Sequence, residues 1–348
     1  MSISTALNNA VSGLTASSRM AEVVSSNTAN AMTAGYARRE LSLSAETLGG
    51  NGGVRILGVN RMINATLLQD RRLSDAETAN ASARADFATR FEDQLGVPET
   101  EGSLSWTLSE FESALIEAGS IPDSTARLTA AVSAAQSVAN KLNSVSDDLQ
   151  QTRLKADHSI ASQVDTLNET LQQIEKLNRT ITTQTSIGGD ASGLMDQRQT
   201  LIDQISTIVP VRVVARDNDQ IAIFTTGGAV LLDGSASTVG FNASGVMSAD
   251  MTLDSGALSG LTINGRTVST SDDGPLGGGT LGAAFAVRDE LAPEAQAQLD
   301  AFARNLIERF QDPALDTTLA AGDPGLFTDA GDALDKLDEV GLAGRIQI

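Results

Sequence analysis

The sequence contains no cysteine among its 348 residues. This absence excludes disulfide frameworks, thiolate nucleophiles and metal sites with cysteine ligands. Histidine is almost as scarce, and the single residue, His158, lies in a polar run where we expect an exposed helical side chain. No second histidine exists to complete a metal site, and a hydrolytic triad is hard to assemble around one. We therefore expect no catalytic residue, no metal site and no cofactor.

Aromatic side chains are also rare, at 3% of the sequence, with one tryptophan and one tyrosine. Hydrophobic residues nevertheless make up 41% of the chain, which is within the range of folded proteins and is enough for two or more domains. A core built from alanine, valine, leucine and isoleucine, with few large rings, favours long helices packed side by side.

Basic residues are few, with 24 lysines and arginines against 44 acidic residues and a net charge of −20. Phosphate backbones and anionic membrane surfaces repel such a chain, so we expect neither nucleic acid nor a membrane as a partner. No run approaches the ~20 apolar residues of a membrane span. No basic residue precedes Arg19 and no continuous apolar stretch follows the start, so we expect no cleavable signal peptide.

What the chain does have, at its beginning, is an apolar stripe with alternating spacings of four and three residues. This spacing predicts a helix with a heptad seam that packs against other helices, in this chain or in a neighbour. The alternative is an ordinary amphipathic helix in a self-contained bundle. The seam comprises Ile3, Leu7, Ala10, Leu14, Ser17, Ala21, Val24, Thr28 and Ala31.

A much longer helix is predicted from Asp123 to Ile187, because an apolar stripe runs through this stretch without proline or glycine. At 1.5 Å per residue it would be about 90 Å long, which indicates a rod-like bundle. Asp123 or Ser124 could cap its start. Further helices are expected at Met62–Leu95, Trp106–Glu117, Leu194–Ile208 and Phe285–Phe310, with loop or extended structure from Ala34 to Asn60.

Residues 211–282 have a different character, with short apolar runs separated by turn residues at Asp217-Asn218, Gly227-Gly228 and Asn264-Gly265. This pattern predicts strands. The fold class is therefore α+β, mainly α, an elongated helical rod made by both ends of the chain with an inserted β-rich part. We expect four parts: residues 1–60 (assembly helix and extended linker), 61–210 (helical core), 211–282 (β-rich) and 283–348 (return helix and loop).

The segment from Ser25 to Arg38, SSNTANAMTAGYAR, resembles the N-terminal motif of flagellar rod, hook and hook-associated proteins. That motif has two asparagines three residues apart, then Thr-x-Gly-Tyr or Phe, then a basic residue. Ser26 and Thr28 depart mildly from it. Asparagine can end a helix, glycine permits a turn and tyrosine offers an anchoring ring. The matching residues here are Asn27, Asn30, Gly35, Tyr36 and Arg38.

A second segment, Asp196-Gln197-Arg198 within a Leu-x-Asp-Gln-Arg string, narrows the resemblance to hook-associated proteins. The run Gly279-Thr280-Leu281-Gly282 is similar to a third segment, found in the member at the hook-proximal side of the junction. The resemblance covers residues 1 to about 330. It implies that Asp196, Gln197 and Arg198 help to orient the β-rich part, whereas a helix-surface set of ion pairs is the simpler interpretation.

The resemblance implies a structural, non-enzymatic subunit that connects hook to flagellin filament outside the cell, exported by the flagellar route. The implied partners are copies of the chain in a ring, the hook protein, the next hook-associated protein and an export chaperone. The implied assembly residues are Ile3, Leu7, Leu14, Val24, Asn27, Asn30, Gly35, Tyr36 and Arg38. Family members also end in a long C-terminal assembly helix, which we expect to be absent from this chain.

Three alternatives remain open on the sequence. The first is another axial subunit, such as a flagellin or a hook protein. The second is a secreted coiled-coil adhesin, which fits the composition but not the motifs. The third is an enzyme that cleaves peptidoglycan, which would need a positioned pair of carboxylic acids. The glycine-rich runs at 49–53 and 274–279 lack the features of phosphate loops, and the acidic run at 312–323 is expected to be a solvated loop.

Overall fold

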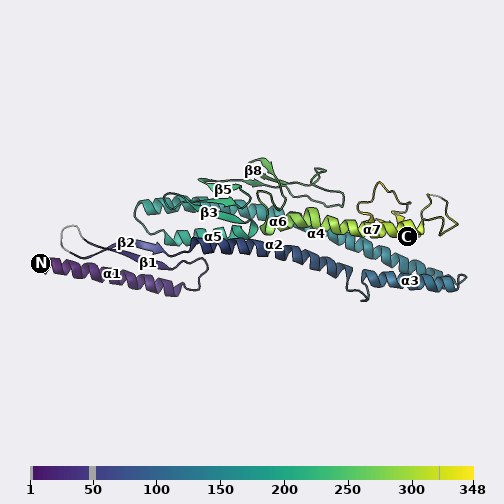
Figure 1. Cartoon of the computed structure of the whole chain (residues 1–348), viewed down its shortest axis with the longest axis horizontal. Helices are drawn as coiled ribbons and strands as arrows, with labels where there is room; N and C mark the ends of the chain where they lie inside the picture. The colour runs from purple at the N-terminus through teal and green to yellow at the C-terminus, as the bar shows by residue number, and fades with distance from the viewer. Residues whose placement is uncertain (1–2, 47–51, 321) are drawn as a thin grey trace.

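One helix, α4 (Thr125–Ser186), extends along most of the molecule (Figure 1). The computed structural model describes residues 3–46, 52–320 and 322–348. The 62 residues of α4 contain no proline or glycine, and the helix is continuous, about 93 Å long at 1.5 Å per residue. The predicted long helix is therefore confirmed. Ser124 precedes its first turn as expected, but its side chain makes no capping hydrogen bond.

The other helices of the rod lie along α4, and local capping determines where two of them begin. The Asn64 side chain accepts a hydrogen bond from the Leu67 amide and so starts α2, later than Met62. The Ser103 hydroxyl accepts one from the Trp106 amide and starts α3. No helix among the described residues is long and apolar enough to cross a bilayer. The helices that lie along α4 are α2 (Ala65–Leu95), α3 (Leu104–Ser120), α5 (Ser192–Ile208), α6 (Gly279–Ala286) and α7 (Ala292–Phe310).

The β-rich part lies on one side of α4 and α5 (Figure 1). Its first sheet has the antiparallel order β3-β4-β5-β6, and its second has the order β7-β8-β9. Asn264 and Gly265 form a tight turn with φ of 50° and 78°, as predicted. In the turn predicted at Asp217-Asn218, the residues with positive φ are Asn218 and Asp219, one position further along the chain. The strands are β3 (Val211–Ala215), β4 (Ile221–Thr225), β5 (Val230–Asp233), β6 (Ser235–Ala236), β7 (Val239–Gly240), β8 (Leu261–Ile263) and β9 (Arg266–Val268), and a small pair near the end, β10 (Thr328–Asp329) and β11 (Ile346–Gln347).

The return helix begins at Gly279 rather than at Phe285, so the last four residues assigned to the β-rich part are helical. Gly279 has a φ of +59°, and a Cβ there would collide with the Ile208 carbonyl group. Its own carbonyl accepts a hydrogen bond from the Asn80 side chain of α2, at 2.8 Å. The helices α2, α5 and α6 therefore approach one another closely at Gly279, where a side chain would not fit. Helix α6 begins at this contact, six residues before the predicted start. A π-helical segment, Val287–Leu291, then joins α6 to α7.

The first 61 residues form a separate feature, which we call the arm (residues 3–61). It consists of α1 (Ile3–Ala29) and an antiparallel hairpin of β1 (Arg39–Ala45) and β2 (Val54–Arg61), paired so that Arg39 faces Arg61. The stretch from Ala34 to Asn60, expected to be loop or extended structure, thus contains the two paired strands of a hairpin. Residues 49–51 of the glycine-rich run lie outside the described part. The arm occupies one end of the rod, opposite the end that holds the last residues (Figure 1).

Two hydrophobic cores lie one after the other along α4. The first half of α4 contributes Leu142, Val145 and Leu149, which pack with α2, α3, α7 and the C-terminal segment. The second half contributes residues such as Ile160 and Leu167, which pack with α5, α6 and the sheets. One helix therefore unites both cores, which makes the rod a single folded body.

A buried ionic network separates the two cores. The side chains of Asp157 on α4 and Arg288 in the π-helical segment are almost fully buried, and their carboxylate and guanidinium lie 2.6 Å apart. Arg153, also buried, donates to the Arg288 carbonyl at 2.9 Å. The same groups hold an irregular segment, residues 242–260, against α4, through hydrogen bonds that involve Ser244, Ser248, Met251 and Ser259.

The network generates a stability prediction. Asp157→Ala leaves Asp289 as the only carboxylate partner of the Arg288 guanidinium among the described residues and removes the acceptor of the Ser244 amide. Leaving these buried donors unsatisfied should lower the free energy of unfolding by about 1–3 kcal/mol. Asp165→Ala, at an exposed position on the same helix, should change the free energy of unfolding by less than about 0.5 kcal/mol. Urea unfolding followed by circular dichroism measures both. Equal stability of the two variants would contradict a structural role for the network.

Candidate assembly interface

Helix α1 has two opposite faces, and only one of them packs on the chain itself. Ala16 and Val23 are buried against the hairpin. Leu7 lies about 180° around the helix from Ala16 and is 62% exposed. The rest of the apolar stripe is equally open, with Ile3 90%, Leu14 73% and Val24 57% exposed. Within the described part of the chain, the predicted seam therefore has no covering element.

The inward face of α1 is polar over much of its length, so hydrogen bonds hold the hairpin. The Ser12 hydroxyl accepts from the Val54 amide at 3.2 Å. Further along, the Asn27 side chain bonds both backbone groups of Arg39: its oxygen accepts from the amide at 2.9 Å and its nitrogen donates to the carbonyl at 2.8 Å. Asn27 thus fixes where β1 leaves the turn after α1.

Tyr36 completes this turn. Its phenol donates to the Asn27 side-chain oxygen at 2.8 Å, and the Arg39 guanidinium lies over its ring, 4.9 Å from the centroid. Asn30 donates from its side chain to the Ser26 carbonyl at 2.9 Å, just after the last residue of α1. Asn27, Asn30 and Tyr36, picked out from the sequence, therefore meet in one turn.

Gly35 brings this turn against the core. Its φ is +78°, which favours glycine, and a Cβ at this position would collide with the Thr200 hydroxyl of α5. Asp196, which lies one helical turn before Thr200 on α5, is the residue that binds the arm. The chain can therefore approach α5 closely enough for backbone and side-chain hydrogen bonds to form between arm and core.

Asp196 is the centre of that contact. Its carboxylate accepts hydrogen bonds from the Ala37 amide at 3.2 Å, from Arg61 Nε at 2.9 Å and from Arg39 Nη2 at 3.1 Å. Its side chain is only 12% exposed, so solvent screens these charges weakly. Arg61 also donates to Gln199 at 3.0 Å. One carboxylate of α5 thus binds the first residue of β1 and the last residue of β2, at the open end of the hairpin.

Arg198 points to the other side of α5 and serves the β-rich part. Its Nη1 atom donates to the Asn178 side chain of α4 and to the Asp219 carbonyl in the turn between β3 and β4, both at 2.7 Å. Burial lowers the pKa of Arg198 to about 10, which leaves the guanidinium charged at neutral pH. Gln197 between them is exposed. The Asp-Gln-Arg segment is therefore a junction between three parts and not a surface set of ion pairs.

The sequence pointed to Arg38 but missed Arg39 and Arg61. Arg38 is exposed, and its backbone carbonyl accepts from the Met62 amide at 2.8 Å. A signal for the missed pair was present, because Leu41 and Leu43 alternate with polar residues, as do Val54 and Ile56. Pairing these two runs as a hairpin places Arg39 opposite Arg61 and suggests a shared carboxylate.

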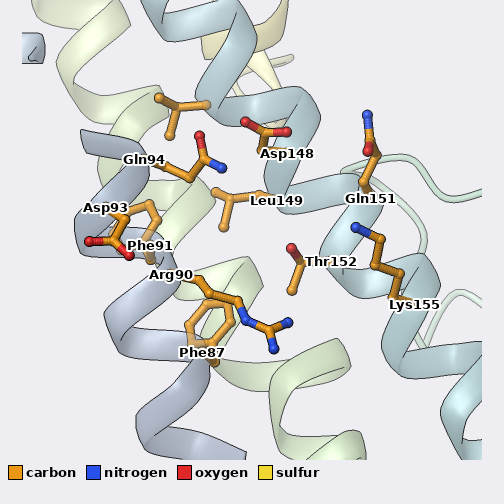
Figure 2. Close-up of a pocket in the computed structure, with 11 residues that line it drawn as sticks. Phe87, Arg90, Phe91, Asp93, Gln94, Asp148, Leu149, Gln151, Thr152 and Lys155 are labelled. Atoms are coloured by element: carbon orange, nitrogen blue, oxygen red, sulfur yellow. The ribbon is translucent and has the colours of Figure 1, made fainter. Parts of the chain in front are cut away.

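No group of three or more histidine, aspartate or glutamate side chains suited to a metal ion occurs among the described residues. His158 is exposed, as expected. The hollow shown in Figure 2 lies between α2 and α4 and brings Phe87, Phe91 and Leu149 beside the charged side chains of Arg90 and Lys155. Asp93 of α2 and Asp148 of α4 also line it.

Known proteins resemble this chain across most of its length. The sequence profile of the flagellar hook-associated protein FlgK helical domain matches residues 88–325. Flagellar hook-associated protein 1 of Escherichia coli K12 is 27% identical over 241 residues, which are 67% of this chain and 44% of that protein. The protein of the same name from Bacillus subtilis 168 is 25% identical, over 98% of this chain and 73% of its own length.

A relative of the same name from Salmonella typhimurium LT2 is 28% identical over 67% of this chain and 43% of its own length. The chain thus spans less than half the length of the enterobacterial relatives that it matches. The solved structure of the flagellar hook junction protein FlgK from Burkholderia pseudomallei aligns with a TM-score of 0.58 at 20% identity, over 70% of this chain and 43% of that one. This likeness concerns the fold.

The arm yields a prediction for Asp196. Asp196→Ala removes the carboxylate that binds the arm, so the amides of residues 37–61 should exchange hydrogen faster while those of α4 keep their protection. Gln197→Ala, one residue away and exposed, is the matched control and should leave both regions unchanged. Hydrogen exchange read by mass spectrometry makes the comparison. Unchanged protection of the hairpin in Asp196→Ala would show that other contacts hold the arm.

A second prediction concerns α1 itself. Its stripe is open in the single chain and its inward face is largely polar, so little apolar burial offsets the ~1–2 kcal/mol per residue of backbone ordering. We expect the amides of residues 5–30 to exchange much faster than those of α4 when the chain is monomeric. Strong protection of these residues in a monomer would contradict the idea that α1 is ordered mainly by assembly.

Proposed function

We propose, because this chain belongs to the family of the flagellar hook-associated protein FlgK, that it is a structural subunit that joins the flagellar hook to the flagellin filament. The observation that carries the proposal is the two-faced arm helix. Its polar face binds the hairpin, and its apolar face, including Ile3, Leu7, Leu14 and Val24, is open for helices of other subunits. Such a seam is what a tube built of packed helices requires.

The partners follow from the same role. They are copies of this chain arranged in a ring, the hook protein on one side and the next hook-associated protein on the other, with an export chaperone before assembly. The relatives' names support this choice over flagellin or hook protein. A structural role also accounts for what the two charged side chains of the Asp-Gln-Arg segment contact, because Asp196 and Arg198 both bind neighbouring parts of the chain.

Two features of the chain suit export of an unfolded subunit before assembly. A subunit that travels unfolded through a narrow channel benefits from a terminal helix that is marginal alone and from a sequence free of disulfides. We infer that the arm becomes fully ordered only when other subunits cover the stripe. The location of the working protein is then the flagellum outside the cell.

The test is a genetic one. Loss of the gene should leave cells with hooks that carry no filament, because the filament cannot be attached to the hook without the junction protein. Leu7→Asp and Leu14→Asp should give the same bare hooks, since each places an unpaired charge on the seam. Asn8→Asp adds the same charge to an exposed position about 100° away on α1 and should assemble normally.

Electron microscopy of flagella and swimming assays measure these outcomes, and circular dichroism of the purified variants confirms that the core remains folded. Filaments of normal length in the deletion strain would overturn the junction role. Normal filaments with Leu7→Asp and Leu14→Asp together would instead exclude the α1 seam as the assembly face.

A further inference from the structure

Charge is distributed very unevenly along the rod. The arm contains five arginines and three glutamates, a net charge of +2, whereas the whole chain carries −20, so the remaining residues carry −22. At the opposite end of the rod, residues 311–348 contain eight acidic and two basic residues, a net charge of −6. Figure 1 places these two segments at opposite ends. The molecule is therefore an electrostatic rod with a basic end and an acidic end.

Not all arginines of the arm are engaged within the chain. Arg19 pairs with Glu22, and Arg39 and Arg61 both pair with Asp196. Arg38 and Arg55 are exposed and form no ion pair with any described residue. These two cations are available to a partner that presents carboxylates.

Arg38 stands beside an apolar groove that lies between α1 and β1. Met20, Val23, Val24 and Leu41 supply most of its apolar lining. A ligand for this groove therefore needs a protruding apolar side chain and at least one neighbouring carboxylate. The groove lies towards the hairpin and shares Val24 with the C-terminal end of the seam, whereas Leu7 and Leu14 lie outside it. The Glu40 side chain also lines it, so Arg38 is the cation that a carboxylate of a partner would meet.

The acidic end of the same chain presents this combination. Leu337 is 96% exposed, at the tip of a turn in which the Asp335 carboxylate accepts a hydrogen bond from the Leu337 amide at 2.9 Å. Asp338 and Glu339 follow it directly. Glu339 pairs with Arg304, and the exposed Asp338 carboxylate lies 3.5 Å from Arg345. The turn therefore presents an exposed leucine beside the exposed carboxylates of Asp335 and Asp338, which complement the apolar lining of the groove and the charge of Arg38.

We propose that the Leu337 turn of one copy of the chain docks in the groove beside Arg38 of a second copy. Leu337 covers the apolar lining, and a carboxylate of the turn faces Arg38. The contact is heterologous, because the two surfaces are different and lie at opposite ends of the rod. It therefore arranges copies head to tail, and opposite charges steer the two ends together.

This contact rests on the proposal that copies of the chain assemble with one another, and it specifies which surfaces meet. It can fail while the junction role holds, since it is tested at Arg38 and Leu337, whereas the junction role is tested by loss of the gene and at Leu7 and Leu14. Bare hooks in the deletion strain, with no effect of these two residues on association, would be that result.

The experiment uses the whole chain in sedimentation at about 0.01 M and about 1 M sodium chloride, between which the screening length falls from about 30 Å to about 3 Å. We expect wild-type copies to associate at low salt and to separate at high salt. Arg38→Glu and Leu337→Asp should each weaken the association by at least about tenfold. Arg266→Glu and Val246→Asp, exposed positions of the same kinds in the β-rich part, are the matched controls and should associate as wild type does.

Mixing the two variants gives the sharpest test. An Arg38→Glu copy keeps its Leu337 turn, and a Leu337→Asp copy keeps its groove, so the equimolar mixture should form dimers that go no further. Each variant alone should remain monomeric, with circular dichroism showing that both are folded. A monomeric wild type at low salt, association that either variant leaves unchanged, or a mixture that stays monomeric would each overturn the proposal.

Discussion

The ion pair between Asp157 and Arg288 is the constraint on which the rest of the rod depends. It lies between two hydrophobic cores that share one helix, at the place where the apolar stripe of α4 is interrupted. Arg153 extends it to the irregular segment 242–260. Because a buried charge needs its partner, the network permits only one alignment of α4 with the returning helix and with the β-rich part.

The arm is attached by the same kind of chemistry on a smaller scale. One carboxylate, Asp196, holds two arginines and a backbone amide, and Asn27 holds the start of the hairpin. Polar contacts serve here because most large apolar side chains of α1 are directed away from the chain, with Val23 as the exception. If Leu7 and Leu14 anchored α1 to its own chain, they would be buried there and could not contact other subunits. The polar inner face of α1 therefore attaches the helix to the hairpin, while the apolar outer face stays exposed to other subunits.

Local signals in the sequence were enough for much of this architecture. The length of α4 followed from an apolar period without breakers, and the turn at Asn264-Gly265 followed from residues that accept positive φ. The position of Asp196 was recognised by resemblance, but its partners were not, because Arg39 and Arg61 are 157 and 135 residues away in the chain. The early start at Gly279 and the π-helical segment depend on tertiary contacts with Ile208 and Asp157, which no local pattern reports.

The scarcity of aromatic residues has an optical consequence. The only tyrosine, Tyr36, is bonded to Asn27 in the turn of the arm, and the only tryptophan, Trp106, lies in the first turn of α3, near the other end of the rod. Each fluorophore therefore reports on one end of the molecule without interference from a second of its kind. Tryptophan emission follows the packing of α3 on α4, while tyrosine emission follows the docking of the arm. The native chain thus carries two separate spectroscopic labels, one for each end.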